Sequence, residues 1–78
     1  MSKQRHPGFI VYVDGNTKEE SREPIAEVPE SLRFAETEDG EVPIVKVVSY
    51  LEGDRRIIRE YGPNDELLRS TVQIRSRE

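Results

Sequence analysis

The chain has 78 residues, of which 36% are charged and 33% hydrophobic, and its formal charge is −4 at pH 7. This length limits it to a single domain with a modest core. The absence of cysteine excludes disulfides, zinc–thiolate sites and thiol catalysis, and a small domain without disulfides favours a reducing cytoplasm.

The first residues predict a flexible tail followed by a strand. Residues 1–7 are polar and without periodicity, so we expect a mobile tail in which His6 is inert. Residues 8–14 contain an apolar stretch that stops at Val13, too short for a signal peptide or a membrane span. Because this stretch is apolar on both faces, it is typical of a central strand.

Residues 15–31 predict a long acidic loop. Residues 17–23 contain no apolar side chain, so neither a second strand nor a stable amphipathic helix is expected there. Thr17 and Glu20 have the spacing of a helix cap, which favours at most one short helical turn. A connection of this length is typical of a functional or a mobile loop.

The next segment predicts a hairpin. Residues 31–37 alternate in polarity, and Leu32 and Phe34 share one face of a half-buried strand. Asp39-Gly40 is the dipeptide preferred in a type I′ turn, so the chain should turn directly into the apolar run that follows.

Residues 42–75 predict an antiparallel meander of three strands. The run 42–51 is apolar on both faces, which is typical of a central strand with a layer on each side. Gly53-Asp54 then turns the chain and places Ile57 and Ile58 on opposite faces of the next strand. Residues 62–65 form the second turn, and the length of that loop decides the register of the last strand.

The predicted fold is therefore mainly β, an antiparallel meander of about five strands in a small curled sheet, barrel or sandwich, with at most one short helix. It occupies residues 8–78 as one domain. Because so short a chain cannot cover both faces of a central strand, either barrel closure or a second copy must supply the missing layer. A homodimer is the favoured interpretation, since symmetric dimers are the commonest soluble oligomers.

The sequence indicates no catalysis. Its single histidine lies in the predicted tail, so a nucleophilic triad has no base. With 16 acids in 78 residues, carboxylates come close by chance, and the five isolated glycines form no phosphate-binding loop. We therefore expect no catalytic residues, no metal and no cofactor.

Two binding functions remain. The first is a small intracellular interaction or regulatory protein that binds an unidentified protein partner through a strand edge or its acidic segment. Residues 14–41 carry ten acids against three bases. The candidate partner-binding residues in that segment are Glu19, Glu20, Glu23, Glu27 and Glu30.

The alternative is binding of single-stranded nucleic acid by arginines and aromatic rings on the last strands. The candidate residues for that face are Arg55, Arg56, Arg59, Arg69, Tyr50 and Tyr61. The net negative charge of the chain makes this function the less favoured one, because nucleic-acid binders usually carry a basic surplus.

Overall fold

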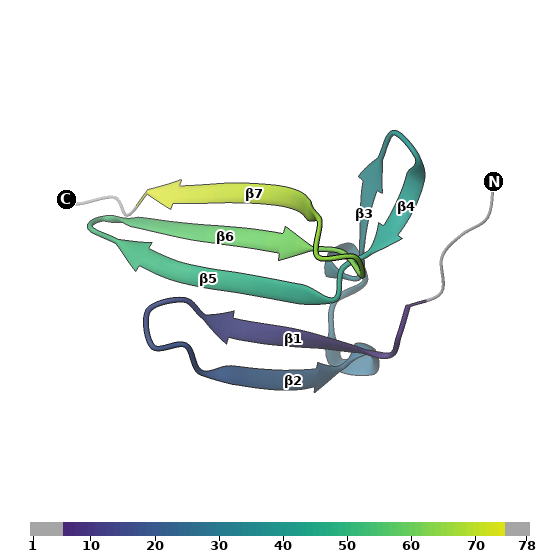
Figure 1. Cartoon of the computed structure of the whole chain (residues 1–78), viewed down its shortest axis with the longest axis horizontal. Coiled ribbons are helices and arrows are strands. Elements are labelled where there is room, and N and C mark those ends of the chain that lie inside the picture. The colour runs from purple at the N-terminus through teal and green to yellow at the C-terminus, as the bar shows by residue number, and fades with distance from the viewer. Residues whose placement is uncertain (1–5, 75–78) are drawn as a thin grey trace.

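The computed structural model describes residues 6–74, and most of them lie in strands (Figure 1). Five strands form one mixed sheet in the order β2-β1-β5-β6-β7, and β3 and β4 form a separate hairpin. The element bounds are β1 Phe9–Asp14, β2 Glu20–Pro24, β3 Phe34–Thr37, β4 Gly40–Pro43, β5 Lys46–Glu52, β6 Arg55–Tyr61 and β7 Leu67–Ile74, with 3-10 turns η1 Ile25–Glu27 and η2 Glu30–Leu32. The predicted mainly β fold is confirmed, and the described residues contain no helix beyond these two turns.

The hairpin between β5 and β6 forms as the sequence predicts. Its two-residue loop is Gly53-Asp54, and Gly53 adopts a φ of +64°, a conformation that side chains with a Cβ rarely take. Ile57 and Ile58, as neighbours in a strand, lie on opposite faces of the sheet, and the register places Ile57 on the face of Tyr50 and Ile58 on the face of Ser49.

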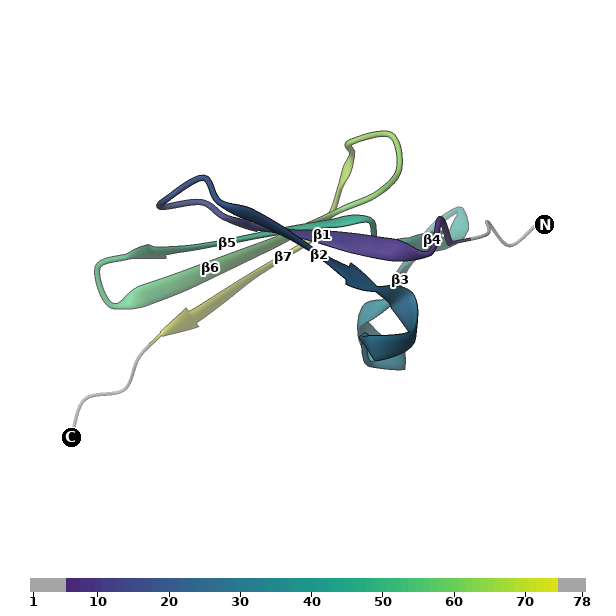
Figure 2. The same ribbon diagram turned by 90° about the horizontal axis from the view of Figure 1, so that it is seen from below.

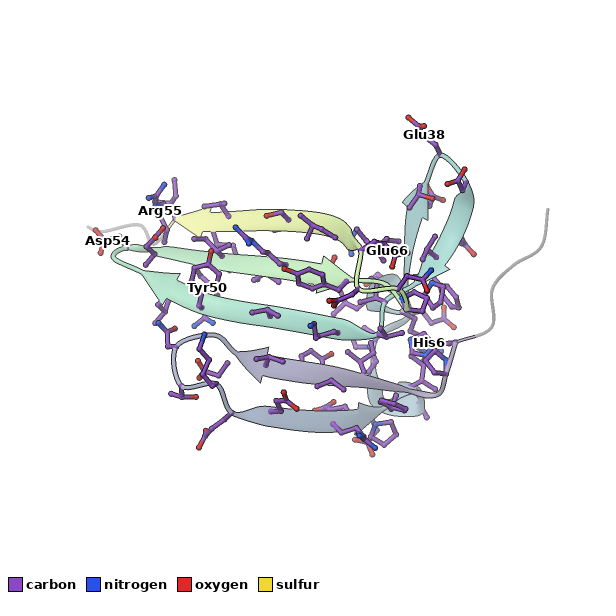
Figure 3. The ribbon with its side chains drawn as sticks, in the orientation of Figure 1. His6, Glu38, Tyr50, Asp54, Arg55 and Glu66 are labelled. Atoms are coloured by element: carbon purple, nitrogen blue, oxygen red, sulfur yellow. The ribbon has the colours of Figure 1, made fainter. Side chains whose placement is uncertain are left out.

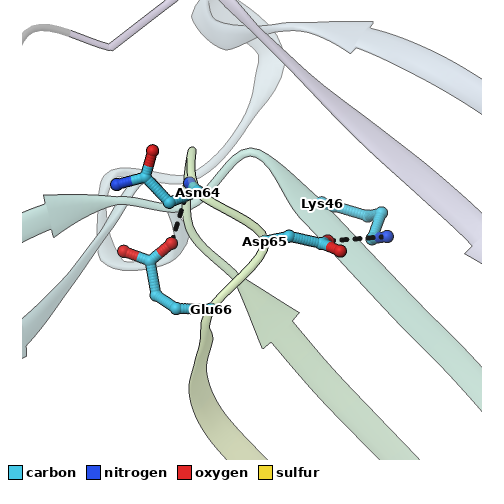
Figure 4. Close-up of polar contacts among 4 residues, drawn as sticks. All are labelled: Lys46, Asn64, Asp65 and Glu66. Atoms are coloured by element: carbon cyan, nitrogen blue, oxygen red, sulfur yellow. Dashed lines mark hydrogen bonds and ion pairs between the residues drawn. The ribbon is translucent and has the colours of Figure 1, made fainter.

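β6 and β7 are joined by a five-residue loop, residues 62–66. A bulge between Glu60 and Tyr61 accompanies this loop and sets the register of β7. The loop is held by an ion pair between Lys46 and Asp65 at 3.2 Å and by the Asn64 backbone N–H, which donates to Glu66 at 2.8 Å (Figure 4).

β1 joins the meander by parallel pairing with β5, an arrangement that the predicted antiparallel meander did not include. After the last residue pair of this ladder, Asp14 and Ser49, the Gly15 N–H donates to the Ser49 carbonyl at 2.8 Å. The side-chain amide of Asn16 then donates to the Leu51 carbonyl at 3.2 Å and accepts from the Leu51 N–H at 2.8 Å. The Asn16 amide therefore acts as one more residue of the ladder.

β2 lies inside the predicted acidic loop 15–31, so that prediction is wrong for residues 20–24. Its sequence, Glu-Ser-Arg-Glu-Pro, lacks any large aliphatic or aromatic side chain. The strand forms because its main chain pairs with β1 over five residues. An edge strand that packs against no second layer can be polar on both faces, and a search for apolar alternation misses it.

The run 42–51 is not one strand. β4 ends at Pro43 and β5 begins at Lys46, and Ile44 in the bend between them is fully buried. The β3–β4 hairpin is present, but Gly40 rather than a loop residue carries the positive φ, at +107°. Its two loop residues have negative φ, so the turn is not the predicted type I′.

The core lies behind one end of the sheet, where η1 and η2 pack (Figure 2). Its buried hydrophobic members there are Ile10, Val28, Ala35, Val42 and Ile44. Ala35, not Phe34, is the buried residue of β3, and Leu32 lies in η2, exposed. The predicted strand 31–37 is therefore shorter than expected, because a 3-10 turn occupies its first residues.

His6 is not part of a flexible tail, and the prediction is wrong for this residue. Its Nε2–H donates to the Ile44 carbonyl at 2.8 Å, and its Nδ1 accepts from the Gly8 N–H at 3.1 Å. The ring also meets Phe34 edge-on, with centroids 5.7 Å apart. His6 thus fastens the start of β1 to the core, while residues 1–5 of the predicted tail lie outside the described residues.

Candidate functional site

The sheet has two unlike faces. η1 and η2 cover one end of the back face, whereas on the opposite face the β6–β7 loop rises at one end and the β1–β2 turn at the other (Figure 2). Figure 3 shows Tyr50 on that uncovered side, which we call the front face. By strand register its residues are Phe9, Val11, Val13, Glu20, Arg22, Pro24, Lys46, Val48, Tyr50, Glu52, Arg55, Ile57, Arg59, Tyr61, Leu67, Ser70, Val72 and Ile74.

The floor of the front face is aliphatic. Val11, Val13 and Val48 from the two central strands are half-buried, and Ile57 is 8% exposed although no second layer covers it. At the edge, Val72 is 53% exposed. The sheet therefore presents branched apolar side chains to the outside over its central strands.

Each aromatic ring of the front face has a cation stacked on it. The pairs, with distances from the charged group to the ring centroid, are Arg22 on Phe9 at 4.5 Å, Lys46 on Tyr61 at 5.0 Å and Arg59 on Tyr50 at 5.9 Å. By strand register Arg22 and Lys46 flank Val11, which is half-buried. Long basic side chains commonly cover apolar neighbours with their aliphatic stems while their charged ends stay in water. Phe9, Arg22 and Lys46 were not among the predicted site residues. The β1–β5 register brings Phe9 and Arg22 to the face of Tyr50 and Tyr61, and the β5–β6 register places Lys46 opposite Tyr61.

Charge is distributed unevenly between the surfaces. The front face carries four basic side chains against Glu20 and Glu52, although the whole chain has a net charge of −4. The β3–β4 hairpin carries four acids and no base, and Glu38 stands at its tip (Figure 3). The front face is thus the positive surface of an acidic protein.

The five predicted partner-binding glutamates do not form one surface. Glu20 lies on the front face of β2, and Glu23 lies on its back face beside Ile10. Glu19 precedes β2, Glu27 lies in η1 and Glu30 lies in η2. Burial and strand register therefore divide the acidic segment among several places on the molecule.

The predicted nucleic-acid residues are also divided. Arg55, Arg59, Tyr50 and Tyr61 lie on the front face, whereas Arg56 and Arg69 lie on the back. The Arg56 guanidinium donates to the Ser49 hydroxyl at 2.9 Å.

Arg69 is engaged in a structural ion pair. Its Nε–H donates to a carboxylate oxygen of Glu60, which is only 7% exposed. This hydrogen bond and the charge of Glu60 raise the pKa of Arg69 against the opposing effect of burial. The pair satisfies a buried carboxylate, so Arg69 has a stabilising role in the sheet.

An open groove of about 560 Å³ lies over β1, β2 and β5. Its lining includes Tyr12, Asp14, Ser21, Ser49 and Arg56, most of them on the back face. Burial, followed by the charges of Glu23 and Glu60, raises the pKa of Tyr12. Within residues 6–74 no three histidine, aspartate or glutamate side chains are arranged to hold a metal ion.

No protein-family model, curated protein or solved structure matches this chain. Over the part of the chain that the structure describes, no helix has the length and apolar character needed to cross a membrane. The function is therefore argued from the geometry of the sheet.

The two edges of the sheet differ sharply. β2 has five residues, three of them charged, and ends in a proline. β7 has eight residues with neither proline nor glycine. It carries three of the five large hydrophobic side chains that are exposed among residues 6–74: Leu67, Val72 and Ile74. The sequence analysis considered strand edges only in general terms, because the strand order was not known.

Proposed function

We propose that this chain is a non-catalytic protein-interaction protein that binds a polypeptide partner across the front face of its sheet. The observation that carries the proposal is the uncovered aliphatic floor between three aromatic rings, each of which has a basic side chain over it. Aromatic and arginine side chains around an apolar centre are typical of protein-binding surfaces.

The chemistry of the face specifies the partner. Apolar side chains of the partner would cover the floor formed by Val11, Val13 and Val48, and its carboxylates would pair with the cations above the rings. A standard interface buries about 800 Å² on each partner, a modest share of the 5963 Å² surface of this chain. The partner is thus a segment in which acidic residues flank apolar ones.

Single-stranded nucleic acid is the second candidate, favoured by the presence of Tyr50, Tyr61, Arg55 and Arg59 on one face. Three features support the polypeptide instead. The rings are already stacked with the protein's own cations, the space between them is aliphatic, and Glu20 and Glu52 would repel phosphates.

The test is a pull-down from native lysate, with and without nuclease, followed by affinity measurement with the purified partner. We expect the double variant Arg22→Glu/Arg59→Glu to lose the partner. The variant Lys18→Glu/Arg56→Glu makes the same change in net charge away from the front face and should retain it.

If both variants bound the partner equally well, the front face would be excluded as the binding site. Recovery of nuclease-sensitive nucleic acid without a stable protein partner would favour the second candidate. Affinity for that ligand should fall steeply with salt, because counterions are released when phosphates are neutralised.

A further inference from the structure

The outer side of β7 presents main-chain groups that the sheet leaves unpaired. In a two-residue hairpin the residues that flank the loop form a hydrogen-bonded pair, here Glu52 and Arg55. Counting from that pair, the main-chain N–H and C=O groups of the odd-numbered residues of β6 form hydrogen bonds with β5, and those of the even-numbered residues form hydrogen bonds with β7. Ser70, Val72 and Ile74 therefore direct their N–H and C=O groups away from β6, along the edge of the sheet.

Over residues 70–74 this edge lacks the devices by which sheets protect themselves, and the bulge at Leu68 lies before that stretch. Edge strands are usually short, charged, bulged or interrupted by proline, and β2 at the opposite edge fits that description. The only charged residue of β7 is Arg69, whose guanidinium is held by Glu60. Val72 and Ile74 are 53% and 73% exposed on the front side of the strand. Such an edge is a template for another strand.

The two ends of β7 are complementary in charge. β3 lies beside the start of β7, so the acidic β3–β4 hairpin with Glu36, Glu38 and Asp39 stands at that end (Figure 1). The end of β7 lies opposite Arg55 and Arg56. Antiparallel pairing of two β7 strands brings the start of each beside the end of the other. It therefore brings the acidic hairpin of one copy toward the arginines of its partner.

We propose that β7 pairs antiparallel with β7 of a second copy, so that two five-stranded sheets become one. In an antiparallel pair, two residues that lie opposite each other direct their main-chain groups in the same way, toward the partner strand or away from it. Because this direction alternates along β7, the two-fold axis must pass beside a residue and not between two residues. An axis at Thr71 would place Arg69 opposite Gln73, and an axis at Val72 would place Ser70 opposite Ile74. Either axis makes the front faces of the two copies continuous. The inference does not depend on the proposed function, since it rests on the main-chain groups at the outer side of β7 and not on the cations and rings of the front face.

The first test is the mass of the protein in solution by sedimentation and light scattering. We expect a species of twice 9.0 kDa for the unaltered chain. Ser70→Pro removes an outward N–H that β6 does not use, so it should give a monomer with an unchanged circular dichroism spectrum. Glu20→Pro is the matched control at the other edge, because its N–H also points away from the sheet, and it should remain a dimer.

The second test does not depend on proline. The chain has no cysteine, so Thr71→Cys and Val72→Cys each introduce a single thiol. Across a two-fold axis at either residue the Cα atoms approach within the range of a disulfide, so one of these variants should form a covalent dimer under mild oxidation. Ser21→Cys on β2 is the control and should not.

A monomeric unaltered chain at concentrations well above the micromolar range would overturn the inference. So would a dimer that survives Ser70→Pro while neither β7 cysteine crosslinks more than Ser21→Cys. A monomer whose β7 binds a strand of a different protein would also overturn it. The front-face proposal would then still be decided by the variant Arg22→Glu/Arg59→Glu and its control.

Discussion

Replacing Arg69 by leucine should lower the free energy of unfolding by about 2 kcal/mol, because the change leaves the Glu60 carboxylate buried without its partner. Removing one member of a fully buried ion pair costs about 3–5 kcal/mol, whereas an exposed pair contributes about 0.2–1 kcal/mol. The side chains of Glu60 and Arg69 are 9% and 45% exposed, so water can partly replace the guanidinium and the cost should fall between these values. For a domain of this size, the loss corresponds to roughly 10 °C in Tm.

The measurement is urea denaturation followed by far-UV circular dichroism, with the slope m compared between variants. Glu60→Leu combined with Arg69→Leu removes both members of the pair and should recover most of the loss. Arg55→Leu is the control, since the ion pair of Arg55 with Glu52 at 3.6 Å is exposed on both sides, and it should change stability by less than about 0.5 kcal/mol. The reasoning is refuted if Arg69→Leu behaves like this control, or if the double variant costs the sum of the single changes.

Three further outcomes are expected. His6→Ala should destabilise the fold by about 1 kcal/mol, since it removes the hydrogen bond to the Ile44 carbonyl, and an unchanged Tm would contradict that role. Gly15→Ala should cost about 1–3 kcal/mol, because a Cβ there would lie 2.9 Å from that of Tyr50; neutral behaviour in urea would show that the ring moves easily. The pKa of Tyr12 is raised above 10.0 in the folded chain, so the unfolded chain loses the phenol proton at a lower pH. The free energy of unfolding therefore keeps the full contribution of this group below pH 10.0 and falls as the pH rises through the folded-state pKa. Tyr12→Phe should flatten that alkaline loss in denaturation curves, and an unchanged slope would argue against it.

The parts of the fold set by short turns could be read from the sequence. Gly53-Asp54 fixes the β5–β6 hairpin and places Ile57 on the same face as Tyr50, since a two-residue loop leaves no choice of register. β2 could not be found in this way, because its stability comes from the main chain of β1 and not from its own side chains. The anchoring of His6 depends on Ile44, which is 38 residues away in the sequence.

The residues of the candidate site could be predicted only in part, because some of them come together through pairing of strands that are distant in the sequence. Tyr50, Tyr61 and Arg59 were named from the sequence, and the structure places them on one face. Arg22 and Phe9 join that face through the parallel pairing of β1 with β5, for which the sequence gives no local signal. Proximity in sequence grouped Arg56 with Arg55, although adjacent residues of a strand point to opposite faces.

The parallel ladder between β1 and β5 also has a consequence for the folding kinetics. The β1–β2 hairpin and the β5–β6–β7 meander each close through short turns, so both units can form within microseconds. The ladder that unites them joins residues about 35 positions apart, as the contact between Asn16 and Leu51 illustrates, and it must first overcome the entropy of closing that loop. We therefore expect docking of the two units to be the slow step of folding. The amide of Asn16, which adds a rung to the ladder without lengthening β1, stabilises the product of that step.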